Sequence, residues 1–456
     1  MHLKMLYVVH QFFPRHLTGT ETYTYELARA AQQSGHEVSV LCYEHSTLPG
    51  VPRRGVLNDV YEGIPVTRFC YDSKTWTNPT LYEYWNEEFR ELANTFFQKQ
   101  RPDIIHFTHN SLLSAALLDS AHSLGIPAVL TLTDFWYICP RMQLVRENGA
   151  LCEGPVGELD CYECFHAPAL DRWRFITGRL PGFARKAVAA LRSRLKRKVL
   201  TARASSDKFL DAALNRAPRL KEAIRLADVV IAPTRFLRDM FQKNGFDTSR
   251  WRLINFGINT ALLDRAQHAP ANSFRFAFVG TLNHHKGCHL LIDVFKEIPG
   301  ESLELQIYGS ETQFPDYARA LRKSAAADSR IKFRGTFPRE DIGRVLAGMD
   351  ALVMPSLWYE NSPLMLLFAL ASHTPVIATD VGGLSEFIRD DENGLLFKAG
   401  DTGSLRATMK RFLDDPALAP RIRAASANVK SIAEHSAEIR NIYRSLVKTT
   451  AKGGTP

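Results

Sequence analysis

The sequence lacks any apolar run that approaches the ~20 residues a helix needs to cross a bilayer. Its first residues, MHLKMLYVVHQFFP, contain too short an apolar core for a signal peptide, because His, Gln and Pro interrupt it. Internal repeats and low-complexity arrays are also absent. We therefore expect a cytoplasmic protein whose 456 residues fold into two or three globular domains.

Negative charge is missing from one long stretch. Residues 172–206 contain eleven Lys and Arg residues and no Asp or Glu, whereas the rest of the chain is nearly neutral. Apolar residues recur at helical spacing from Phe183 to Val199. The pattern predicts a basic amphipathic helix, which either docks the protein peripherally on an anionic inner membrane face or is a solvated helix packed on its domain. No recognition fold accompanies this charge, so nucleic acid is not an expected partner.

Cysteine is scarce outside one cluster. Four of the seven cysteines lie between residues 139 and 164, with the spacing C-x12-C-x8-C-x2-C. Structural disulfides are not expected in the cytosol. The spacing favours a tetrahedral structural zinc site, with an iron–sulfur cluster or no metal as alternatives. The ligands would be Cys139, Cys152, Cys161 and Cys164, whereas Cys42, Cys70 and Cys288 are expected to be buried apolar side chains.

Strand and helix patterns alternate along the chain, which predicts an α/β protein with parallel sheets and helices on both faces. We expect two doubly wound, Rossmann-like domains that face each other across a cleft. Apolar runs typical of strands are KMLYVV, HEVSVLC, DIIHF, PAVLTL, DVVIAP and WRLINF in the first half, and FRFAFVG, LELQIYG, IKFRG, ALVMP and PVIAT in the second. Helical patterns in the first half include Glu21–Gln33, Leu81–Gln98 and Ser111–Leu124. The expected organisation is a first domain (1–264) with a Cys-rich loop (134–168) and the basic segment (172–206), a linker (265–273), a second domain (274–432), and a terminal helix and tail (433–456).

The second domain carries two motifs that suit a nucleotide-sugar. In PSLWYENSPL, Ser362 and Pro363 predict a helix start, whose free amides and positive dipole end attract a phosphate. Glu360 lies just before this helix, and an ionised carboxylate suits sugar hydroxyls. In FAFVGTLNHHKG, Gly280 and Lys286 resemble a phosphate cradle. The alternative is an ordinary capped helix of an α/β domain.

The first domain offers a loop and two polar side chains. Gly19 and Thr20 lie between the first strand and a helix, where a backbone loop often touches a ligand. His109 and Asp134 follow the third and fourth strand patterns, so both are expected to point at the ligand edge of the sheet. In each case a purely structural role is the alternative.

Blocks along nearly the whole chain resemble the retaining glycosyltransferase family 4, whose members have the GT-B fold. The blocks are GTETYTYELARAAQQSGHEVSVL, RPDIIHFTHNSLLSAALLDSAHSLGIPAVLTLTDFWYICPR, DVVIAPTRFLRDMFQKNG, INFGINT, FVGTLNHHKG, IKFRGTF, PSLWYENSPL and TPVIATDVGG. The resemblance implies a nucleoside-diphosphate sugar donor, a glycan or lipid-linked acceptor, retention of anomeric configuration, no cofactor needed for catalysis, and a role in surface polysaccharide or glycoconjugate synthesis. The candidate catalytic residues are then Lys286, Glu360, His109 and Asp134, and the candidate donor-binding residues are Gly19, Thr20, Gly280, Thr281, Asn361, Ser362, Leu364 and Phe368.

Three positions depart from the family's pattern. Phe368 stands where a second glutamate commonly grips the nucleotide ribose, and losing that charged hydrogen bond would cost about 1.5–3 kcal/mol. Thr281 replaces an arginine that assists the phosphates, and Thr133 replaces a histidine often credited with touching the donor. These departures keep a second hypothesis open, in which the chain is a non-catalytic GT-B protein that binds a glycan or a partner transferase.

Overall fold

The computed structural model describes residues 1–146, 149–155, 161, 164, 208–263, 271–425 and 429–453. The basic segment 172–206, most of the expected linker and the end of the tail lie outside these residues. The chain forms two compact units. Unit 1 contains Met1–Ile231, Met240–Arg252 and Asn441–Pro456, and unit 2 contains Ala232–Asp239 and Leu253–Arg440. In the division expected from the sequence, the first domain ran to residue 264 and the terminal helix was separate from both domains. In the structure, the end of that helix belongs to unit 1.

Unit 1 is built on an eight-stranded sheet with the order β3-β4-β2-β1-β5-β6-β7-β8. The pairings from β4 through to β7 are parallel, and β3 pairs antiparallel with β4. The strands are β1 (Lys4–Val8), β2 (Glu37–His45), β3 (Gly55–Tyr61), β4 (Ile64–Tyr71), β5 (Ile104–Phe107), β6 (Ala128–Thr131), β7 (Val229–Ala232) and β8 (Arg252–Leu253). The parallel core of the sheet agrees with the continuous apolar runs, because strands covered on both faces are buried throughout.

The antiparallel hairpin of β3 and β4 was not among the strands expected from the sequence. Strand β3 is half exposed in strict alternation, and Val56 and Val60 are open to solvent. An edge strand of this kind has one wet face, so its sequence, GVLNDVY, mixes polar and apolar residues and lacks the apolar run of a buried strand.

The helices of unit 1 include α1 (Gly19–Gln33), α2 (Pro79–Tyr82), α3 (Glu87–Gln100), α4 (Ala116–Ser123), α8 (Lys208–Ile224) and the end of α9 (Arg235–Lys243), whose first residues belong to unit 2. The single helix expected over Leu81–Gln98 is wrong. The first piece ends at Tyr82, and Asn86 caps the second, since its side chain accepts a hydrogen bond from the amide of Phe89. The helix expected from Ser111 begins only at Ala116, because Leu112 and Ser114 have positive φ angles that no helix accommodates.

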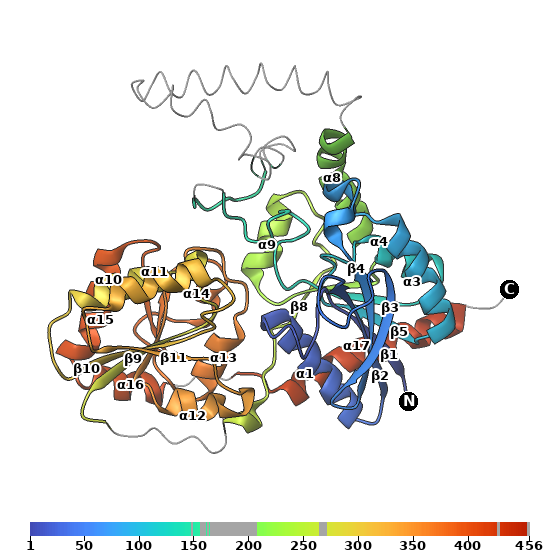
Figure 1. Cartoon of the computed structure of the whole chain (residues 1–456). Coiled ribbons are helices and arrows are strands. Elements are labelled where there is room, and N and C mark those ends of the chain that lie inside the picture. The colour runs from blue at the N-terminus through green and yellow to red at the C-terminus, as the bar shows by residue number, and fades with distance from the viewer. Residues whose placement is uncertain are drawn as a thin grey trace. The chain divides into compact units, whose positions relative to one another are not determined.

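Unit 2 contains a six-stranded sheet with the order β11-β10-β9-β12-β13-β14, in which every pairing is parallel. Its strands are β9 (Phe274–Val279), β10 (Leu303–Tyr308), β11 (Ile331–Gly335), β12 (Ala351–Met354), β13 (Val376–Thr379) and β14 (Leu395–Phe397). Its helices are α10 (Cys288–Lys296), α11 (Pro315–Ala325), α12 (Ile342–Ala347), α13 (Leu364–Ala371), α14 (Leu384–Phe387), α15 (Thr402–Asp414) and α16 (Leu418–Ala424). In Figure 1, α10 and α11 lie on one side of this sheet and α12 on the other. Both sheets therefore confirm the doubly wound α/β class.

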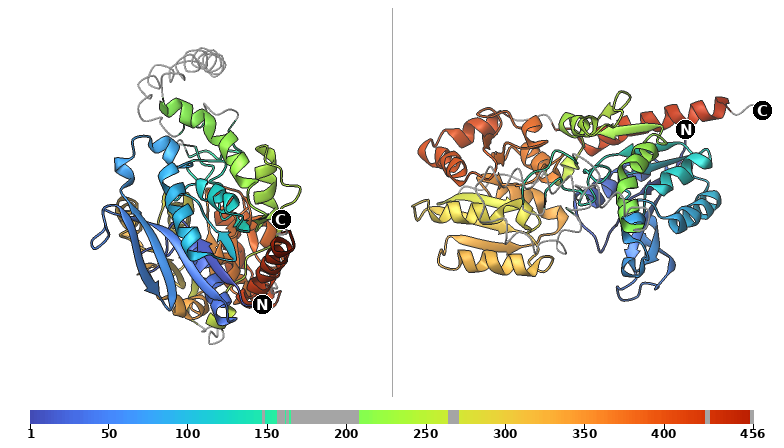
Figure 2. Two further views of the ribbon diagram at one scale, coloured as in Figure 1. Left: turned by 90° about the vertical axis from the view of Figure 1, so that its right-hand side faces the viewer. Right: turned by 90° about the horizontal axis from the view of Figure 1, so that it is seen from above.

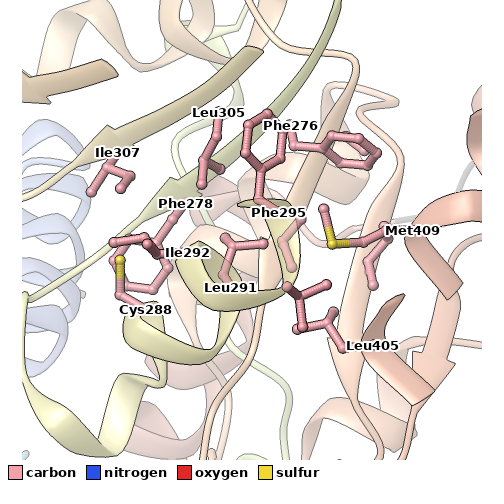
Figure 3. Packing of buried hydrophobic residues seen from close by; sticks show 14 of the residues in the cluster. Phe276, Phe278, Cys288, Leu291, Ile292, Phe295, Leu305, Ile307, Leu405 and Met409 are labelled. Atoms are coloured by element: carbon pink, nitrogen blue, oxygen red, sulfur yellow. The ribbon is translucent and has the colours of Figure 1, made fainter. Parts of the chain in front are cut away.

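Alternate residues of β9 and β10 point into one hydrophobic core of unit 2. Phe276 and Phe278 from β9 pack with Leu291 and Phe295 from α10, and Met409 of α15 closes the cluster (Figure 3). Cys288 lies in the same core, and Cys42 and Cys70 are buried in unit 1, so the expectation for these three thiols is confirmed.

The C-terminal helix α17 (Ile432–Gly453) begins in unit 2 and ends in unit 1. In both views of Figure 2 its red end lies beside the elements of unit 1. There the hydroxyl of Tyr443 hydrogen-bonds the buried ring of His106 on β5. Among the described residues, no helix has the length and apolarity that a membrane span requires.

Candidate functional site

Both sheets reverse their strand order at one strand, and the candidate residues follow these strands. In unit 1, β1 lies between β2 and β5, and in unit 2, β9 lies between β10 and β12. Ligands of open parallel sheets bind beyond the carboxyl ends of the strands at such a switch point. His109 follows β5, Gly280 follows β9, and Glu360 lies in the loop after β12. Each unit is described separately below.

Glu360 is the centre of the polar cluster in unit 2. Its Oε1 atom accepts hydrogen bonds from Lys286 Nζ at 2.6 Å, from Ser356 Oγ at 2.8 Å and from Trp358 Nε1 at 2.8 Å. Glu360 is 3% exposed. The three bonds all end on Oε1, and among the described residues no hydrogen bond reaches the second carboxylate oxygen, Oε2.

The charge state of this carboxylate follows from its partners. Burial by itself raises the pKa of a carboxyl group, but the charge of Lys286 and the three hydrogen bonds outweigh burial, so the pKa of Glu360 lies below its ordinary value. Glu360 is therefore ionised at neutral pH and acts only as a hydrogen-bond acceptor.

Lys286 is held in place by the loop that follows β9. Its ammonium group lies 4.8 Å from the centre of the Trp358 ring, and the ring of His285 packs edge-on against the same tryptophan. Gly287, which has a φ of +72°, allows the close approach of this loop to the β12 loop, because a Cβ atom there would lie 1.8 Å from the carbonyl oxygen of Pro355. Lys286 is thus aimed at Glu360 by backbone geometry.

Helix α13 begins one residue later than expected. Its first residue is Leu364, and Pro363 occupies the N-cap position without a side-chain cap. The prediction that Ser362 caps this helix is wrong: the Ser362 hydroxyl is buried and has no partner among the described residues. Asn361 accepts a hydrogen bond from Thr234 at 2.7 Å, which fixes the turn before the helix. The first amides of α13 remain without intrahelical partners, as at any helix N-terminus.

The other candidate residues of unit 2 differ in their positions. Gly280 and Thr281 directly follow β9 and are partly exposed, and Leu364 is partly exposed at the start of α13. Phe368 is buried, as are the other central residues of that helix. An aromatic ring therefore stands where the resemblance led us to look for a ribose-binding carboxylate.

In unit 1, the first turn of α1 contains Gly19 and Thr20. A Cβ atom at Gly19 would meet no atom within 4 Å, and its φ is not in the left-handed region. The fold therefore does not require glycine at this position. The open space beside its backbone suits the close approach of a ligand, which favours the functional interpretation of Gly19 over the structural one.

His109 and Asp134, which the sequence placed separately at the ligand edge of the sheet, form a pair. His109 Nε2 lies 2.8 Å from Asp134 Oδ2, and the amide of Ser111 donates to His109 Nδ1 at 3.0 Å. The Ser111 contact places the ring proton of the neutral imidazole on Nε2, which donates it to Asp134. Burial favours the neutral ring, but the charge of Asp134 and its hydrogen bond raise the pKa of His109 above its ordinary value.

Sequence reasoning missed two side chains of this cluster, His10 and Glu21. The ring of His10 lies 4.4 Å from that of His109, and His10 Nε2 is 3.2 Å from a carboxylate oxygen of the buried Glu21. Burial lowers the pKa of His10 to about 4, although Glu21 opposes this shift. His10 lies two residues after the end of β1 at the switch point, and this position was the signal that could have identified it.

A hydrogen bond from Trp136 holds this cluster, and Trp136 is itself held by Glu83 and Arg216. The amide of Trp136 donates to Asp134 Oδ1 at 2.8 Å, and its indole nitrogen donates to Glu83. Arg216 donates to the carbonyl oxygen of Trp136 at 2.6 Å and to Glu83 at 2.9 Å. Glu83 and Arg216 are more than a hundred residues apart in sequence, so no local pattern could predict their pairing.

The four clustered cysteines line a common cavity in unit 1. Within the part of the chain that the structure describes, however, no three His, Cys, Asp or Glu side chains stand in an arrangement that already holds a metal. The zinc site stays a prediction.

Comparison with known proteins identifies the kind of protein and its fold. Residues 17–149 match the family described as Glycosyltransferase Family 4, and residues 261–429 match Glycosyl transferases group 1. The second match includes Lys286 and Glu360, and the first includes Gly19, His109 and Asp134. Together these matches support the assignment of the chain to the glycosyl transferases group 1 family. The chain's two parallel-sheet units are those of the GT-B fold.

Relatives of this group 1 chain support the same assignment. A D-inositol 3-phosphate glycosyltransferase from Corynebacterium efficiens is 29% identical over 254 residues, covering 50% of this chain and 59% of the relative. The chain spans about half the length of the relatives it matches. Among solved structures, the sucrose-phosphate synthase of Thermosynechococcus elongatus has a TM-score of 0.66 at 18% identity, with 98% and 99% of the two chains covered. Anabaena HepE in complex with UDP and glucose has a TM-score of 0.64 at 17% identity, with 97% and 100% covered.

Proposed function

We propose that the protein is a glycosyltransferase that moves a sugar from a nucleoside-diphosphate sugar to a glycan or lipid-linked acceptor, with retention of anomeric configuration. The observation that carries this proposal is the buried Lys286–Glu360 pair, which is aimed by two loops at the carboxyl edge of the unit 2 sheet. A buried, ionised carboxylate with one oxygen fully engaged needs a partner for the other oxygen, and a sugar hydroxyl is a suitable donor.

Each group has a role in this reaction. Lys286 is the mobile positive charge that balances the diphosphate, and the free amides at the start of α13 supply further donors. Glu360 holds a hydroxyl of the donor sugar through Oε2 and so orients the anomeric carbon. Lys286 can turn toward the phosphate without leaving the site, because its flexible side chain is 22% exposed.

The chemical step is a displacement at the anomeric carbon. The bond from that carbon to the diphosphate oxygen breaks while the bond to the acceptor oxygen forms, and the acceptor's proton passes to the departing diphosphate. Attack on the face that the phosphate leaves gives retention without a protein nucleophile. Stabilisation of the charge that develops on the diphosphate is then the main contribution of Lys286.

His109 and Asp134 are proposed to act on the acceptor side. The hydrogen bond between them fixes the imidazole ring, and the cluster lies at the switch point of the unit 1 sheet. Gly19 leaves space for the donor phosphates to approach the backbone of α1. These assignments follow the positions that the family resemblance implied.

A nucleotide panel followed by donor hydrolysis tests the proposal. Binding of UDP, GDP, ADP or dTDP to the native state raises the melting midpoint by mass action. We expect one nucleotide to raise it and its sugar conjugate to be hydrolysed, with both effects lost in Lys286→Ala and retained in the matched control Lys296→Ala. Lys296 is a surface residue of α10 that pairs with Asp293. Binding of none of the four at millimolar concentration would favour the non-catalytic alternative, which the buried Phe368 motivates.

The anomeric configuration of the product requires a separate measurement. Once an acceptor is found, proton NMR of the product during the first turnovers distinguishes retention from inversion. A product with inverted configuration would leave the transferase assignment intact and contradict the proposed retention.

A further inference from the structure

We propose that Cys139, Cys152, Cys161 and Cys164 bind one zinc ion in a structural site that fixes the loop leading away from Asp134. This proposal does not depend on the enzymatic activity proposed above. It rests on the cavity that the four residues share, on the folding of the backbone around one of the sulfur atoms, and on the charges of the neighbouring side chains.

All four cysteines line one small cavity in unit 1. Its volume is about 30 Å³, and apolar side chains such as Leu144 and Val145 form much of the remaining wall. A space that admits water-sized spheres also admits a single metal ion. Metal analysis separates zinc from an iron–sulfur cluster, the other metal alternative left open by the spacing.

The backbone after Cys139 folds around its sulfur atom. The amides of Arg141 and Leu144 hydrogen-bond this sulfur, and such bonds stabilise a thiolate. The turn places Met142 and Leu144 at φ angles of +63° and +51°, which are costly for residues other than glycine. Strained backbone angles therefore accompany the donors that surround this sulfur atom, and such donors are typical of the residues that orient a metal ligand.

A short antiparallel bridge returns the chain to the same cavity. Val145 pairs with Leu151, and the amide of Cys152 donates to the carbonyl oxygen of Leu144 at 2.7 Å. The second cysteine is thus anchored beside the turn that contains the first. Cys139 and Cys152 are thirteen positions apart in the sequence, and backbone hydrogen bonds hold them close together. The main chains of two of the four proposed ligands are therefore fixed.

Basic side chains surround the site. Arg141 and Arg146 line the cavity. Four thiolates around one Zn²⁺ carry a net charge of about −2, which needs compensation in a half-buried place. These two guanidinium groups supply it.

The sulfur atoms surround the cavity without yet meeting at one point, since no ligand set of three is formed among the described residues. Zinc–sulfur bonds are ~2.3 Å long, so binding draws the thiolates inward. Such closure is usual, because metal binding and the ordering of its loop are coupled. The amide of Cys139 is bonded to the carbonyl oxygen of Phe135, the residue after Asp134, so closure of the site tightens the turn that carries Asp134.

Metal content tests the proposal. The full chain is produced in zinc-supplemented medium without a metal-affinity tag and analysed by inductively coupled plasma mass spectrometry. We expect about one zinc per chain, a loss of at least tenfold in Cys139→Ser and in Cys164→Ser, and no loss in the control Cys288→Ala, which removes a core thiol of unit 2. Replacement of zinc by Co²⁺ should give the intense near-ultraviolet sulfur-to-cobalt bands of a tetrahedral thiolate site.

If the serine variants do not fold, measurements on the wild-type protein still test the proposal. A strong zinc chelator should lower its melting midpoint, and added Zn²⁺ should restore it. Zinc below a tenth of an equivalent together with no cobalt bands would overturn the proposal. So would iron with a visible absorption, or disulfides that join these four cysteines in protein isolated under a thiol-blocking reagent.

Discussion

Substitution of Lys286 by methionine separates the structural role of the Lys286–Glu360 pair from its role in catalysis. In Lys286→Met the carboxylate of Glu360 stays 3% exposed, keeps the bonds from Ser356 and Trp358, and loses its only countercharge within bonding distance among the described residues. Removing one partner of a buried ion pair costs about 3–5 kcal/mol. Lys286 is 22% exposed, so water can partly replace it, and we expect a loss of about 2–4 kcal/mol.

The measurement is a melting curve, in which about 2–4 °C is lost for each kcal/mol in a unit of this size. Lys286→Met should therefore melt about 5–15 °C below the wild type. The double variant Lys286→Met/Glu360→Gln carries no charge at positions 286 and 360 and should recover most of the lost melting temperature. Neither variant should hydrolyse a donor. If the double variant is as unstable as Lys286→Met, the uncompensated charge is not the cause and the argument fails. A double variant that is both stable and active would refute the proposed role in catalysis.

Three further predictions follow from single features. Burial lowers the pKa values of His10 and His285 to about 4, so the unfolded chain binds more protons than the folded chain between pH 6.5 and pH 4. The free energy of unfolding should therefore fall as the pH falls through this window, by up to about 3 kcal/mol for His10 and by less for the partly exposed His285. Urea unfolding at several pH values measures this loss. Gly287→Ala should destabilise unit 2 by about 2–5 kcal/mol in thermal unfolding, because its Cβ would strike a backbone carbonyl at a positive φ. Gly19→Ala should change stability by less than about 0.5 kcal/mol while weakening donor binding measured by calorimetry; unchanged binding would mean that no ligand approaches this backbone.

The buried parts of both sheets could be predicted from the sequence because a strand covered on both faces is a continuous apolar run. KMLYVV, DIIHF and DVVIAP gave β1, β5 and β7. The hairpin of β3 and β4 and the short strand β14 were missed, since an edge strand or a strand of three residues has no such run. The break between α2 and α3 was missed because a single capping side chain, Asn86, decides it.

Candidate site residues were proposed from the sequence where a residue follows a strand or lies near a helix start. Lys286, Glu360, His109 and Asp134 were chosen in this way, and their roles stay predictions. The structure adds that they form the pairs Lys286–Glu360 and His109–Asp134. The role of Ser362 as a helix cap was predicted incorrectly, because the backbone of Pro363 turns away and the helix begins after it. Capping depends on the dihedral angles of one residue, which composition does not specify.

The sequence by itself determined the fold class, the family and the residue types available for a phosphate and a sugar. These are local properties, since apolar runs, glycine turns and motif order are each contained in a few consecutive residues. Only the tertiary structure decided which groups meet: that Ser356 and Trp358 share one oxygen of Glu360 with Lys286, that Glu21 holds His10 beside His109, and that Arg216 reaches Glu83. These contacts set the pKa values and free the second oxygen of Glu360, and they depend on distances between atoms that are far apart in the chain.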